Sequence, residues 1–345
     1  MSDQKIRVGI VGAGENTRLR HIPGLKAIPG VEIVSVCNRS RESSERVAKE
    51  FGIPTVYDKW EELVAARDTD AIVIGTWPYL HCVVTVTALT AGKHVLCEAR
   101  MARDAREAHA MLRAAREHPQ LVAQLVPAPM TLRVDATVKR LLAEGFVGDV
   151  LAVEVRAGGT FLDKHAPQHW RQDRALSGLN IMSLGIWYET LMRWVGPSSR
   201  VAARGEVFVK ERVDANGRRR PVDIPEHLDV VSSLAGGGQV HLMISNVAGL
   251  AGPAEAFIFG TEGTLRFCDN KLHGGRRADA ALREIPIPPH KESRWRVEKE
   301  FINAIRGNEP VKLTTFEDGV KYMDFTEAVH RSLVTARRRR VAPKN

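Results

Sequence analysis

Residues 8–17 read VGIVGAGENT, an apolar run that passes into Gly12 and Gly14 and then into a polar segment. A strand, a G-x-G turn and a helix in this order form the phosphate-binding turn of doubly wound sheets. The first glycine permits the tight turn, the second lets the backbone approach a pyrophosphate, and the start of the helix supplies free N–H groups. We therefore expect a nicotinamide dinucleotide here. The residues predicted to contact it at the turn are Gly12, Gly14, Glu15, Asn16 and Thr17.

The end of the second predicted strand bears on the choice between NAD and NADP. A carboxylate that holds the adenosine ribose hydroxyls usually stands about 20 residues beyond the glycines. This sequence has Asn38 there, followed by Arg39 and Ser40. Without a carboxylate, a 2′-phosphate meets no like charge, and Arg39 and Ser40 provide groups that bind it. We favour NADP; the alternative is that Arg39 is a solvated loop residue and that NAD binds through Asn38.

The order of the apolar runs predicts the fold. Short β-branched runs alternate with helical patterns over the first 125 residues, which is typical of a parallel doubly wound sheet. Longer alternating strands follow, and they predict a mostly antiparallel open sheet in an α+β domain. The expected class is α/β, with a Rossmann domain at 1–125 and a substrate-binding and oligomerisation domain at 126–345. An alternative packs the C-terminal helix back on the first domain.

The expected strands lie at 5–14, 31–38, 71–77, 94–99 and 121–126 in the first domain and at 150–159, 201–210, 228–247 and 256–267 in the second. The expected helices lie at 41–51, 81–92, 103–118, 133–148, 179–196, 294–306 and 316–337.

Composition narrows the class of protein. The chain has 345 residues, of which 44% are hydrophobic and 26% charged, and no apolar run approaches the length of a membrane span. The N-terminus enters a strand within a few residues, which leaves no room for a signal peptide, so we expect a cytoplasmic protein. Four cysteines without C-x-x-C spacing predict buried thiols rather than a metal site or disulfides.

The formal net charge of +9 raises the question of a polyanionic partner. The basic residues are mostly interleaved with acids, and the two clusters lie at 217–221 and 336–345. No aromatic interleaving or DNA-binding pattern accompanies these clusters, so we interpret them as a solvated turn and a solvated tail. We expect a small-molecule substrate and neither a nucleic acid nor a membrane as partner.

Four further motifs follow the glycine turn in order: VIGTWPYLH at 73–81, AGKHVLCEA at 91–99, HWRQDRALSG at 169–178 and FGTEGTLRF at 259–267. Together with that turn, the chain resembles the Gfo/Idh/MocA family, the relatives of glucose-fructose oxidoreductase and inositol dehydrogenase. The resemblance runs nearly end to end. It implies a Rossmann domain, a C-terminal domain whose open sheet often forms a dimer interface, and a nicotinamide between the domains that faces sugar-like or cyclitol substrates.

The resemblance also implies which loops contact the cofactor. The T-P-N loop of the family corresponds here to Thr76, Trp77 and Pro78, and His81 keeps its spacing. We therefore add Thr76, Trp77 and His81 to the predicted cofactor site. The residues after the fifth strand, Glu98 and Ala99, are predicted to join them.

Two catalytic motifs of the family are changed in this sequence. The family's E-K-P, whose glutamate lies near the cofactor and whose lysine polarises the substrate oxygen and relays its proton, corresponds to Glu98, Ala99 and Arg100. The family's D-x-G-x-H, whose aspartate and histidine touch substrate hydroxyls, corresponds to Ser183 and Trp187 around Gly185. An alanine cannot move a proton, and a positioned acid or base contributes about 10²- to 10⁴-fold in rate.

Other residues must then take over the proton. The candidates are Tyr188 and Glu189 on the central helix and Lys164, His165 and His169 in the loop before it. On a helix, Tyr188 lies about 100° from Trp187 and so borders the predicted site. For each histidine the alternative is a surface or packing role.

Substrate contacts are predicted at Trp77, Arg100, Arg171, Ser183 and Trp187. The two tryptophans offer faces that stack on sugar rings or planar ligands, with core packing as the alternative. Arg100 is the cation that could reach an anionic substrate; it could equally reach solvent or the cofactor phosphates.

Three classes of function remain open. The leading one is an NAD(P)-dependent oxidoreductase of sugars, cyclitols or related hydroxy or carbonyl compounds, with a substituted proton relay. The alternatives are a cofactor-bound non-redox enzyme (a lyase, an isomerase or a glycoside-cleaving enzyme) and a non-catalytic nucleotide-binding sensor. We expect a homo-oligomer, a dimer or a tetramer, because the alternating apolar residues of the second sheet exceed what one layer of helices covers.

Overall fold

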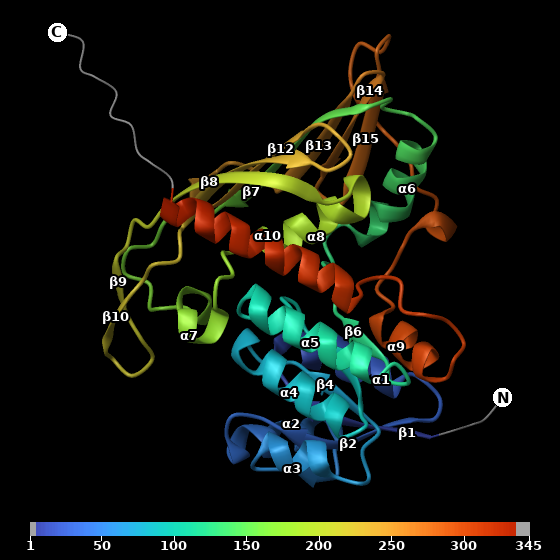
Figure 1. Ribbon diagram of the computed structural model, residues 1–345, viewed down its shortest axis with the longest axis vertical. Coiled ribbons are helices and arrows are strands. Elements are labelled where there is room, and N and C mark those ends of the chain that lie inside the picture. Colours follow the sequence, from blue (N-terminus) through green and yellow to red (C-terminus); the bar gives the residue numbers. More distant parts are fainter. Residues whose placement is uncertain (1–4, 336–345) are drawn as a thin grey trace. The chain divides into compact units, whose positions relative to one another are not determined.

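The computed structural model describes residues 5–335 of the chain (Figure 1). Within them the chain forms two compact units. The first unit comprises the chain up to Pro129 together with residues 174–180 and 294–323. The second comprises residues 130–173, residues 181–293 and the chain from Asp324 on. The basic cluster at 336–345 lies outside the described residues.

The first unit contains a parallel six-stranded sheet in the order β3-β2-β1-β4-β5-β6, which confirms the predicted doubly wound sheet. Its strands are β1 (Ile6–Val11), β2 (Val31–Cys37), β3 (Thr55–Val56), β4 (Ala71–Ile74), β5 (His94–Cys97) and β6 (Ala123–Leu125). Of these six strands, β3 was not predicted, because two residues are too short to show periodicity.

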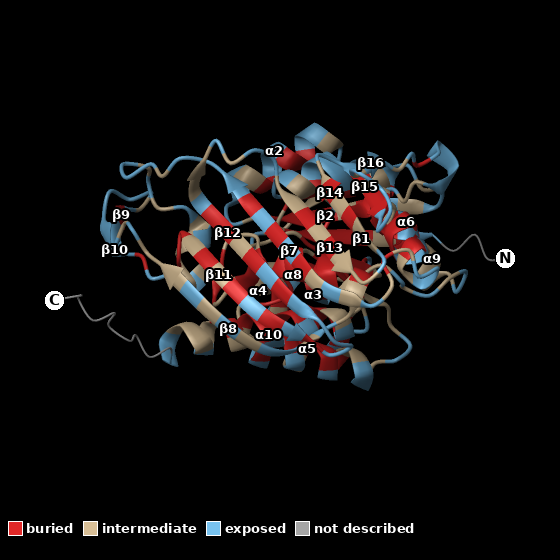
Figure 2. Cartoon of the chain, turned by 90° about the horizontal axis from the view of Figure 1, so that it is seen from above, coloured by how far each residue is buried: buried red, intermediate tan, exposed pale blue. Residues whose placement is uncertain are grey.

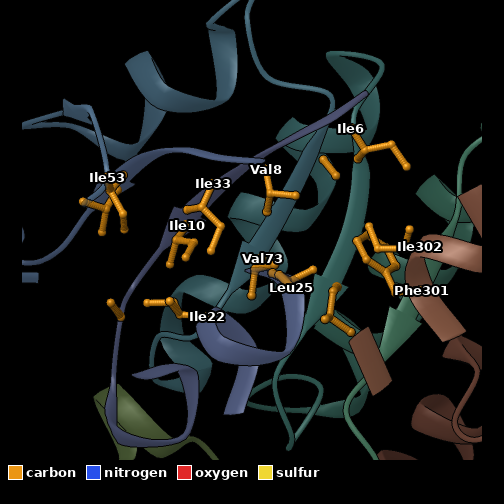
Figure 3. Packing of buried hydrophobic residues seen from close by; sticks show 14 of the residues in the cluster. Ile6, Val8, Ile10, Ile22, Leu25, Ile33, Ile53, Val73, Phe301 and Ile302 are labelled. Atoms are coloured by element: carbon orange, nitrogen blue, oxygen red, sulfur yellow. The ribbon is translucent and has the colours of Figure 1, made fainter. Parts of the chain in front are cut away.

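Helices cover both faces of this sheet. Alternate residues of β1 explain the division: Val8 and Ile10 enter a buried cluster with Leu25 and Phe301 (Figure 3), whereas Gly9 faces Leu63. The helices of this unit are α1 (Ile22–Lys26), α2 (Arg41–Phe51), α3 (Trp60–Ala65), α4 (Pro78–Thr90), α5 (Ala105–Glu117), α7 (Arg174–Ser177) and α9 (Val297–Ile305). A five-residue π-helical turn, Thr17–His21, precedes α1.

The second unit contains an eight-stranded sheet in the order β16-β15-β14-β13-β7-β12-β11-β8, which is antiparallel except for the pair β7 and β12. This confirms the predicted large, mostly antiparallel sheet. The segments 228–247 and 256–267, each predicted as one strand, are instead two strands joined by a turn, because glycines interrupt both runs. Buried and exposed residues alternate along β7, β11 and β12 (Figure 2). The strands are β7 (Val150–Gly159), β8 (Ser198–Glu206), β11 (His227–Leu234), β12 (Gln239–Gly249), β13 (Glu255–Gly260), β14 (Gly263–Cys268), β15 (Lys271–Arg276) and β16 (Arg283–Glu284).

The remaining elements of the chain are short or lie on one face of this sheet. A hairpin of β9 (Glu211–Val213) and β10 (Arg219–Pro221) carries the basic cluster at 217–221, and both β10 arginines are exposed. The helices are α6 (Leu132–Ala143), α8 (Leu184–Val195) and α10 (Phe316–Thr335), with 3₁₀ turns at Trp170–Gln172 and Pro289–Lys291. Helix α10 contributes to both units.

The central helix starts later than the sequence pattern predicts. The apolar period indicated a helix from 179, but α8 begins at Leu184. Asn180 is buried, and its side-chain amide donates to the carbonyls of Ala102 and Ser177, which holds the backbone in a non-helical path. Met182 then adopts a positive φ of 43°. The tertiary contacts of one asparagine therefore outweigh the helical period of the preceding residues.

None of the helices in residues 5–335 is long and apolar enough to cross a membrane. The four cysteines are free thiols; Cys37 and Cys97 are buried, and Cys82 and Cys268 are half-buried. The described part of the chain groups no three His, Cys, Asp or Glu side chains in a way that could hold a metal ion.

Candidate functional site

The glycine turn lies at the carboxyl edge of the parallel sheet, between β1 and the π-helical turn. Gly12 has a φ of +85°, and a Cβ atom there would lie 2.5 Å from the Thr76 side chain and 2.7 Å from the Thr76 backbone nitrogen. Only glycine fits this position. The predicted role of Gly12 in a tight turn therefore has a steric basis.

Thr17 stands where a third glycine is usual, and the structure shows what compensates. That third glycine normally permits close packing between helix and strand. Here the space is left by Gly75, which follows β4: a Cβ on Gly75 would lie 2.1 Å from the Thr17 hydroxyl oxygen and 2.2 Å from the Gly12 carbonyl oxygen. The small residue has moved to the other side of the contact, and the buried Thr17 fills the space.

A cavity of about 640 Å³ opens beside this turn in the first unit; we call it the first cavity. It is lined by residues 11–14, 37–40, 58–61 and 75–77 with Ser43, Arg46, Tyr79 and Leu80. Of the predicted cofactor residues, those that line it are Gly12, Gly14, Asn38, Arg39, Ser40, Thr76 and Trp77. Those that do not line it are Glu15, Asn16, Thr17, His81, Glu98 and Ala99.

The side chains at the end of β2 differ in their contacts: Asn38 and Ser40 hydrogen-bond to the backbone, and Arg39 packs against a ring. The Asn38 carboxamide oxygen accepts a 2.6 Å hydrogen bond from the Ala13 backbone N–H, and its nitrogen donates to Ser43. Asn38 therefore ties the glycine turn to β2. The Arg39 guanidinium lies over the Trp77 ring, 5.5 Å from its centre. Ser40 caps α2 and accepts from the Ser43 N–H.

His81 and Arg100, both predicted to contact a ligand, are buried in the structure. The two ring nitrogens of His81 lie 2.9 Å from the carbonyl oxygens of Thr76 and Arg100, so this residue joins the loops that follow β4 and β5. Burial lowers the pKa of His81. Arg100 is 3% exposed, so its side chain does not extend into solvent.

Behind the glycine turn, three side chains from distant parts of the sequence form a buried group that we call the charge triad: Glu98, His21 and Glu298. His21 Nε2 lies 2.9 Å from Glu98 Oε1, and His21 Nδ1 lies 2.6 Å from Glu298 Oε1. The His21 side chain is fully buried, and the Glu98 and Glu298 side chains are 14% and 5% exposed.

The two carboxylates of the triad accept further hydrogen bonds from N–H groups. Asn16 donates its amide N–H to Glu98 Oε1, and the Ala99 backbone N–H donates to Glu98 Oε2 at 3.2 Å. The Trp295 indole donates to both oxygens of Glu298. Burial alone would lower the pKa of His21, but its hydrogen bonds to Glu298 and Glu98 outweigh burial and raise that pKa to about 9. Burial would raise the pKa of Glu98, yet His21 and Asn16 hold it below its usual value.

The second unit has a cavity of about 400 Å³, the second cavity. Two predicted substrate residues line it: Ser183 directly before α8 and Trp187 one turn along that helix. Trp187 is buried and meets Phe267 edge-on, with ring centres 6.3 Å apart, so it forms an aromatic wall. The polar groups around it come from Thr160, Ser183, Ser245, Asn246, Asp269 and Asn270.

Asp269 and Asn270 form the two-residue turn between β14 and β15. Both have positive φ, 48° and 60°, as a type I′ turn requires. The Asn270 carbonyl accepts a 2.8 Å hydrogen bond from Arg133 on α6, which holds the turn beside the second cavity. Among the described residues that line this cavity, Asp269 is the one ionisable side chain.

The predicted proton-handling residues do not gather at this cavity. Tyr188 is buried; its ring stacks on Phe325 at 3.5 Å, and its hydroxyl oxygen accepts a hydrogen bond from the Ser198 N–H. Burial raises the pKa of Tyr188. Tyr188 faces the core because it lies one residue beyond Trp187 on α8. Glu189 pairs with Arg193 inside the second unit.

The loop before α8 carries Lys164, His165, His169 and Arg171, and all four are exposed. His169 caps the 3₁₀ turn by accepting from the Arg171 N–H, and burial, together with Arg171, lowers its pKa. Arg171 lies over the Trp170 ring. None of these four residues is among the described residues that line the second cavity.

The comparison with known proteins is consistent with this geometry. Residues 6–125 match the oxidoreductase family with an NAD-binding Rossmann fold, and residues 136–266 match the GFO/IDH/MocA C-terminal domain. The chain belongs to the Gfo/Idh/MocA family. It is therefore an NAD-binding oxidoreductase, and the predicted resemblance is confirmed.

Named members of this family show its range. Trans-1,2-dihydrobenzene-1,2-diol dehydrogenase of Bos taurus is 26% identical over 82% of this chain and 79% of its own. The 1,5-anhydro-D-fructose reductase of Ensifer adhaerens is 34% identical over 50% of each chain. Levoglucosan dehydrogenase, solved with NADH and L-sorbose, has the same fold with a TM-score of 0.84, 22% identity and coverage of 95% of this chain and 97% of its own.

Several site residues were not found from the sequence. His21 and Glu298 are 277 residues apart, and no local pattern links them. The Asp269-Asn270 pair between alternating runs is a hairpin signal, but the signal does not say what the turn approaches. A π-helical turn has no sequence pattern that would predict it, and here His21 is its last residue.

The raised pKa of His21 predicts that the free energy of unfolding depends on pH, which tests the pairing of His21 with the two carboxylates. The folded state holds the imidazole proton more tightly than the unfolded chain, whose histidine pKa is near 6.5. This stabilisation is complete below pH 6.5 and is lost as the pH rises through about 9. We expect the thermal unfolding midpoint to fall over that window, and to fall less in His21→Gln.

Calorimetry at a series of pH values measures this slope. His241→Gln, which changes a half-exposed histidine of the open sheet face, is the control and should keep the wild-type slope. An equal slope in wild type and His21→Gln would contradict the assignment.

Proposed function

We propose that this oxidoreductase transfers a hydride between NADP and the hydroxyl or carbonyl carbon of an uncharged sugar, cyclitol or related polyhydroxy compound. The nicotinamide supplies the hydride donor or acceptor when bound. The chain's own residues bind the cofactor, orient the substrate and handle its hydroxyl proton without a lysine at position 99. The observation that carries this proposal is the second cavity, with an aromatic wall, hydroxyl and amide groups and one carboxylate.

The residues of the first cavity fit a dinucleotide. The glycine turn leaves room for a pyrophosphate, since Gly12 admits no side chain. The helical segment that follows has its amino end at this turn, where helices of doubly wound folds bind phosphate groups. The cavity end near β2 then receives the adenosine half. The sequence motif supports this orientation.

The same cavity end supports a preference for NADP. The Asn38 carboxamide is hydrogen-bonded to Ala13 and Ser43, and the end of β2 has no carboxylate that could bind ribose hydroxyls. Arg39 and Arg46 are cations that line the cavity. Asp58 and Glu61 also line it, together with Lys59, and the Asp58 carboxylate is paired with Arg41 at 2.9 Å. A 2′-phosphate there would gain charge-assisted hydrogen bonds.

Arg39→Ala should lower the affinity for NADP by about tenfold or more and change the affinity for NAD little, because a hydrogen bond to a charged group contributes roughly 1.5–3 kcal/mol. Titration calorimetry with both dinucleotides measures this. The control is Arg113→Ala, which removes an exposed cation on α5. Equal affinity of the wild type for NAD and NADP would refute the preference and leave the fold assignment intact.

The lining of the second cavity supports an uncharged substrate. Its described residues include no Lys, Arg or His, so a carboxylate or phosphate group would enter without a counter-charge and beside Asp269. Hydroxyl groups, in contrast, can donate to Asp269 and Asn246 and accept from Ser183 and Thr160. The apolar face of a sugar ring suits Trp187. We propose Asp269 as the residue that accepts a substrate hydroxyl proton, in place of the missing lysine.

A panel of neutral polyols, sugars and cyclitols, with the matching sugar acids and sugar phosphates, should show turnover for the neutral compounds only, followed by the nicotinamide absorbance. Asp269→Asn should then lower turnover by about 10²-fold or more without loss of cofactor binding. Glu284→Gln, which changes an exposed acid on β16, is the control. Turnover of the anionic compounds alone would refute the substrate class, and full activity of Asp269→Asn would refute its role.

A homo-oligomer is the second part of the proposal. Among residues 5–335, no helix of the second unit covers the outward face of its eight-stranded sheet (Figure 2). Phe257 and Phe259 stack on this face with ring centres 5.3 Å apart, and Val231 is 41% exposed there. Such an apolar strip on a flat sheet favours burial against a second copy.

Light scattering should give at least twice the chain mass of 38.2 kDa, and Phe257→Asp should shift the protein toward monomer. Leu19→Asp, which places the same charge on an exposed apolar residue of the first unit, should leave the mass unchanged. A wild-type protein that stays monomeric at high concentration would refute this part.

A further inference from the structure

A chain of hydrogen-bonded side chains connects the second cavity with the outward face of the eight-stranded sheet. Ser245 on β12 is buried and is one of the residues that line this cavity. Its hydroxyl oxygen lies 3.0 Å from Nδ1 of His227 on β11. His227 Nε2 in turn lies 3.1 Å from Asp229 Oδ2. We call these three side chains, Ser245, His227 and Asp229, the serine relay.

An interruption in the sheet explains how Ser245 meets the cavity. β12 pairs with β7 up to Ile244 and then again at Gly249, so the ladder between the two strands is open beside Ser245. Gly158 of β7 lies next to this opening, since a Cβ there would lie 3.2 Å from the Ser245 carbonyl oxygen. Gly158 and Asn246 line the second cavity together with Ser245. The cavity therefore reaches Ser245 where the two strands separate.

The other two members of the relay lie on the outward face of the sheet. Along β11 they alternate with the buried residues Leu228 and Val230, and alternate residues of a strand point to opposite faces (Figure 2). The side chains of His227 and Asp229 are 30% and 42% exposed. The serine relay thus runs from a buried hydroxyl group to side chains that solvent reaches.

Hydrogen-bond chemistry fixes the direction of the relay. An ionised carboxylate only accepts, so His227 Nε2 carries the proton in the contact with Asp229. In a neutral ring Nδ1 is then an acceptor, and the Ser245 hydroxyl donates to it. The Val247 backbone N–H donates to the Ser245 oxygen at 3.2 Å, and a hydroxyl oxygen has a second lone pair. That lone pair can accept from a hydroxyl group in the cavity.

The strands on both sides of β11 place charges of both signs near the relay. The other charged or titratable residues that face this part of the sheet from β8, β12 and β7 are Arg204, Glu206, His241, Glu154 and Arg156. Glu206 stands opposite His227, and Arg204 stands opposite Asp229. His241 Nε2 lies 3.3 Å from the second oxygen of Asp229. An imidazolium at His227 therefore has Asp229 as its hydrogen-bonded counter-ion.

We propose that the serine relay carries the substrate's proton out of the second cavity. The proposal rests on the proposed function, because the oxidation of an alcohol by hydride transfer releases the hydroxyl proton as well. The released proton passes to the Ser245 oxygen while the proton of Ser245 moves to His227 Nδ1. The imidazolium then loses a proton to solvent at the outward face, or to interfacial water where a second copy covers this face. In the reduction direction the same path supplies the proton.

The relay and Asp269 have separate roles. Asp269 lines the same cavity, and in the proposed function it takes the proton of the reacting hydroxyl. A carboxyl group that has taken this proton must lose it before the next turnover. The serine relay returns Asp269 to its ionised form, through a substrate hydroxyl or a water between Asp269 and Ser245. Ser245 is thus the member that faces the substrate, and Asp229 is a positioning residue that holds the His227 ring.

His227→Gln should lower kcat for the oxidation of the best neutral substrate by about 10²-fold or more, because glutamine cannot take up a proton. Ser245→Ala should have the same effect, since it leaves His227 without a donor. The affinity for cofactor should stay unchanged in both variants. The nicotinamide absorbance and titration calorimetry measure these quantities. His290→Gln, which changes an exposed histidine of the 3₁₀ turn Pro289–Lys291, is the matched control and should keep the wild-type kcat.

The pH dependence gives a readout that a merely structural role would not change. An imidazolium cannot accept a proton, so the wild-type kcat for oxidation should fall as the pH decreases from about 8 to about 5. This fall should be absent from the residual activity of His227→Gln. His227→Ala, which leaves space for a small base, should regain part of its turnover when imidazole is added.

Nuclear magnetic resonance of the protein labelled with ¹⁵N-histidine tests the direction of the relay without cofactor or substrate. At about pH 8, where histidine rings are ordinarily neutral, the wild-type His227 ring should carry its proton at Nε2. Asp229→Asn keeps the shape of the side chain, but its amide nitrogen can donate to Nε2. The ring proton should then move to Nδ1, and kcat should fall as it does in His227→Gln.

The outcomes separate this proposal from the proposed function. Wild-type kcat and pH dependence in both His227→Gln and Asp229→Asn would overturn the relay and leave the proposed function standing. A wild-type His227 ring with its proton at Nδ1 would overturn the relay as well, and this measurement requires no variant to fold. An equal loss of turnover in His290→Gln would also overturn it. Failure of the wild type to convert any neutral compound would overturn both proposals.

Discussion

The close approach of two backbones, at Gly12 after β1 and Gly75 after β4, is the constraint on which the carboxyl edge of the first unit depends. β1 and β4 are paired neighbours, and the loops that leave them leave no room for a Cβ at either position. The space goes instead to Thr17, whose side chain is buried there. The π-helical turn that starts at Thr17 ends at His21. The position of the buried His21 ring thus follows from a steric contact at the glycine turn.

Buried charge pairs in the second unit hold loops and helices together. In the second unit Arg212 pairs with Glu226 at 2.8 Å and donates to the carbonyls of Asp163 and Ala166, which fixes the loop that carries the predicted proton-handling residues. Arg193 joins Glu189 and Asp135 between α8 and α6. Removing one partner of such a network leaves an uncompensated buried charge, which typically costs about 3–5 kcal/mol. These groups are therefore tied to the architecture even where they take no part in chemistry.

The alanine at position 99 leaves this position of the loop after β5 without a charge. Ala99 places no cation directly beside Glu98, and the next residue on this loop is the buried Arg100. The second cavity likewise carries an acid without a lining cation. The acid in the second cavity disfavours an anion there and is compatible with the neutral alcohol or carbonyl compound that we propose as substrate.

The sequence by itself determined the parallel sheet, the glycine turn, the second sheet and the family. These features depend on local periodicity and on residues such as Gly12, whose backbone conformation and lack of space no other residue type fits. The sequence also pointed to Ser183 and Trp187, because they keep the helical spacing of a known motif. Only the tertiary structure decided that Tyr188 and Arg100 are buried, that Asp269 lies at a cavity and that His21 stands between Glu98 and Glu298. Burial and charge pairing depend on contacts between residues up to 277 positions apart in the sequence. A local sequence pattern cannot predict such contacts.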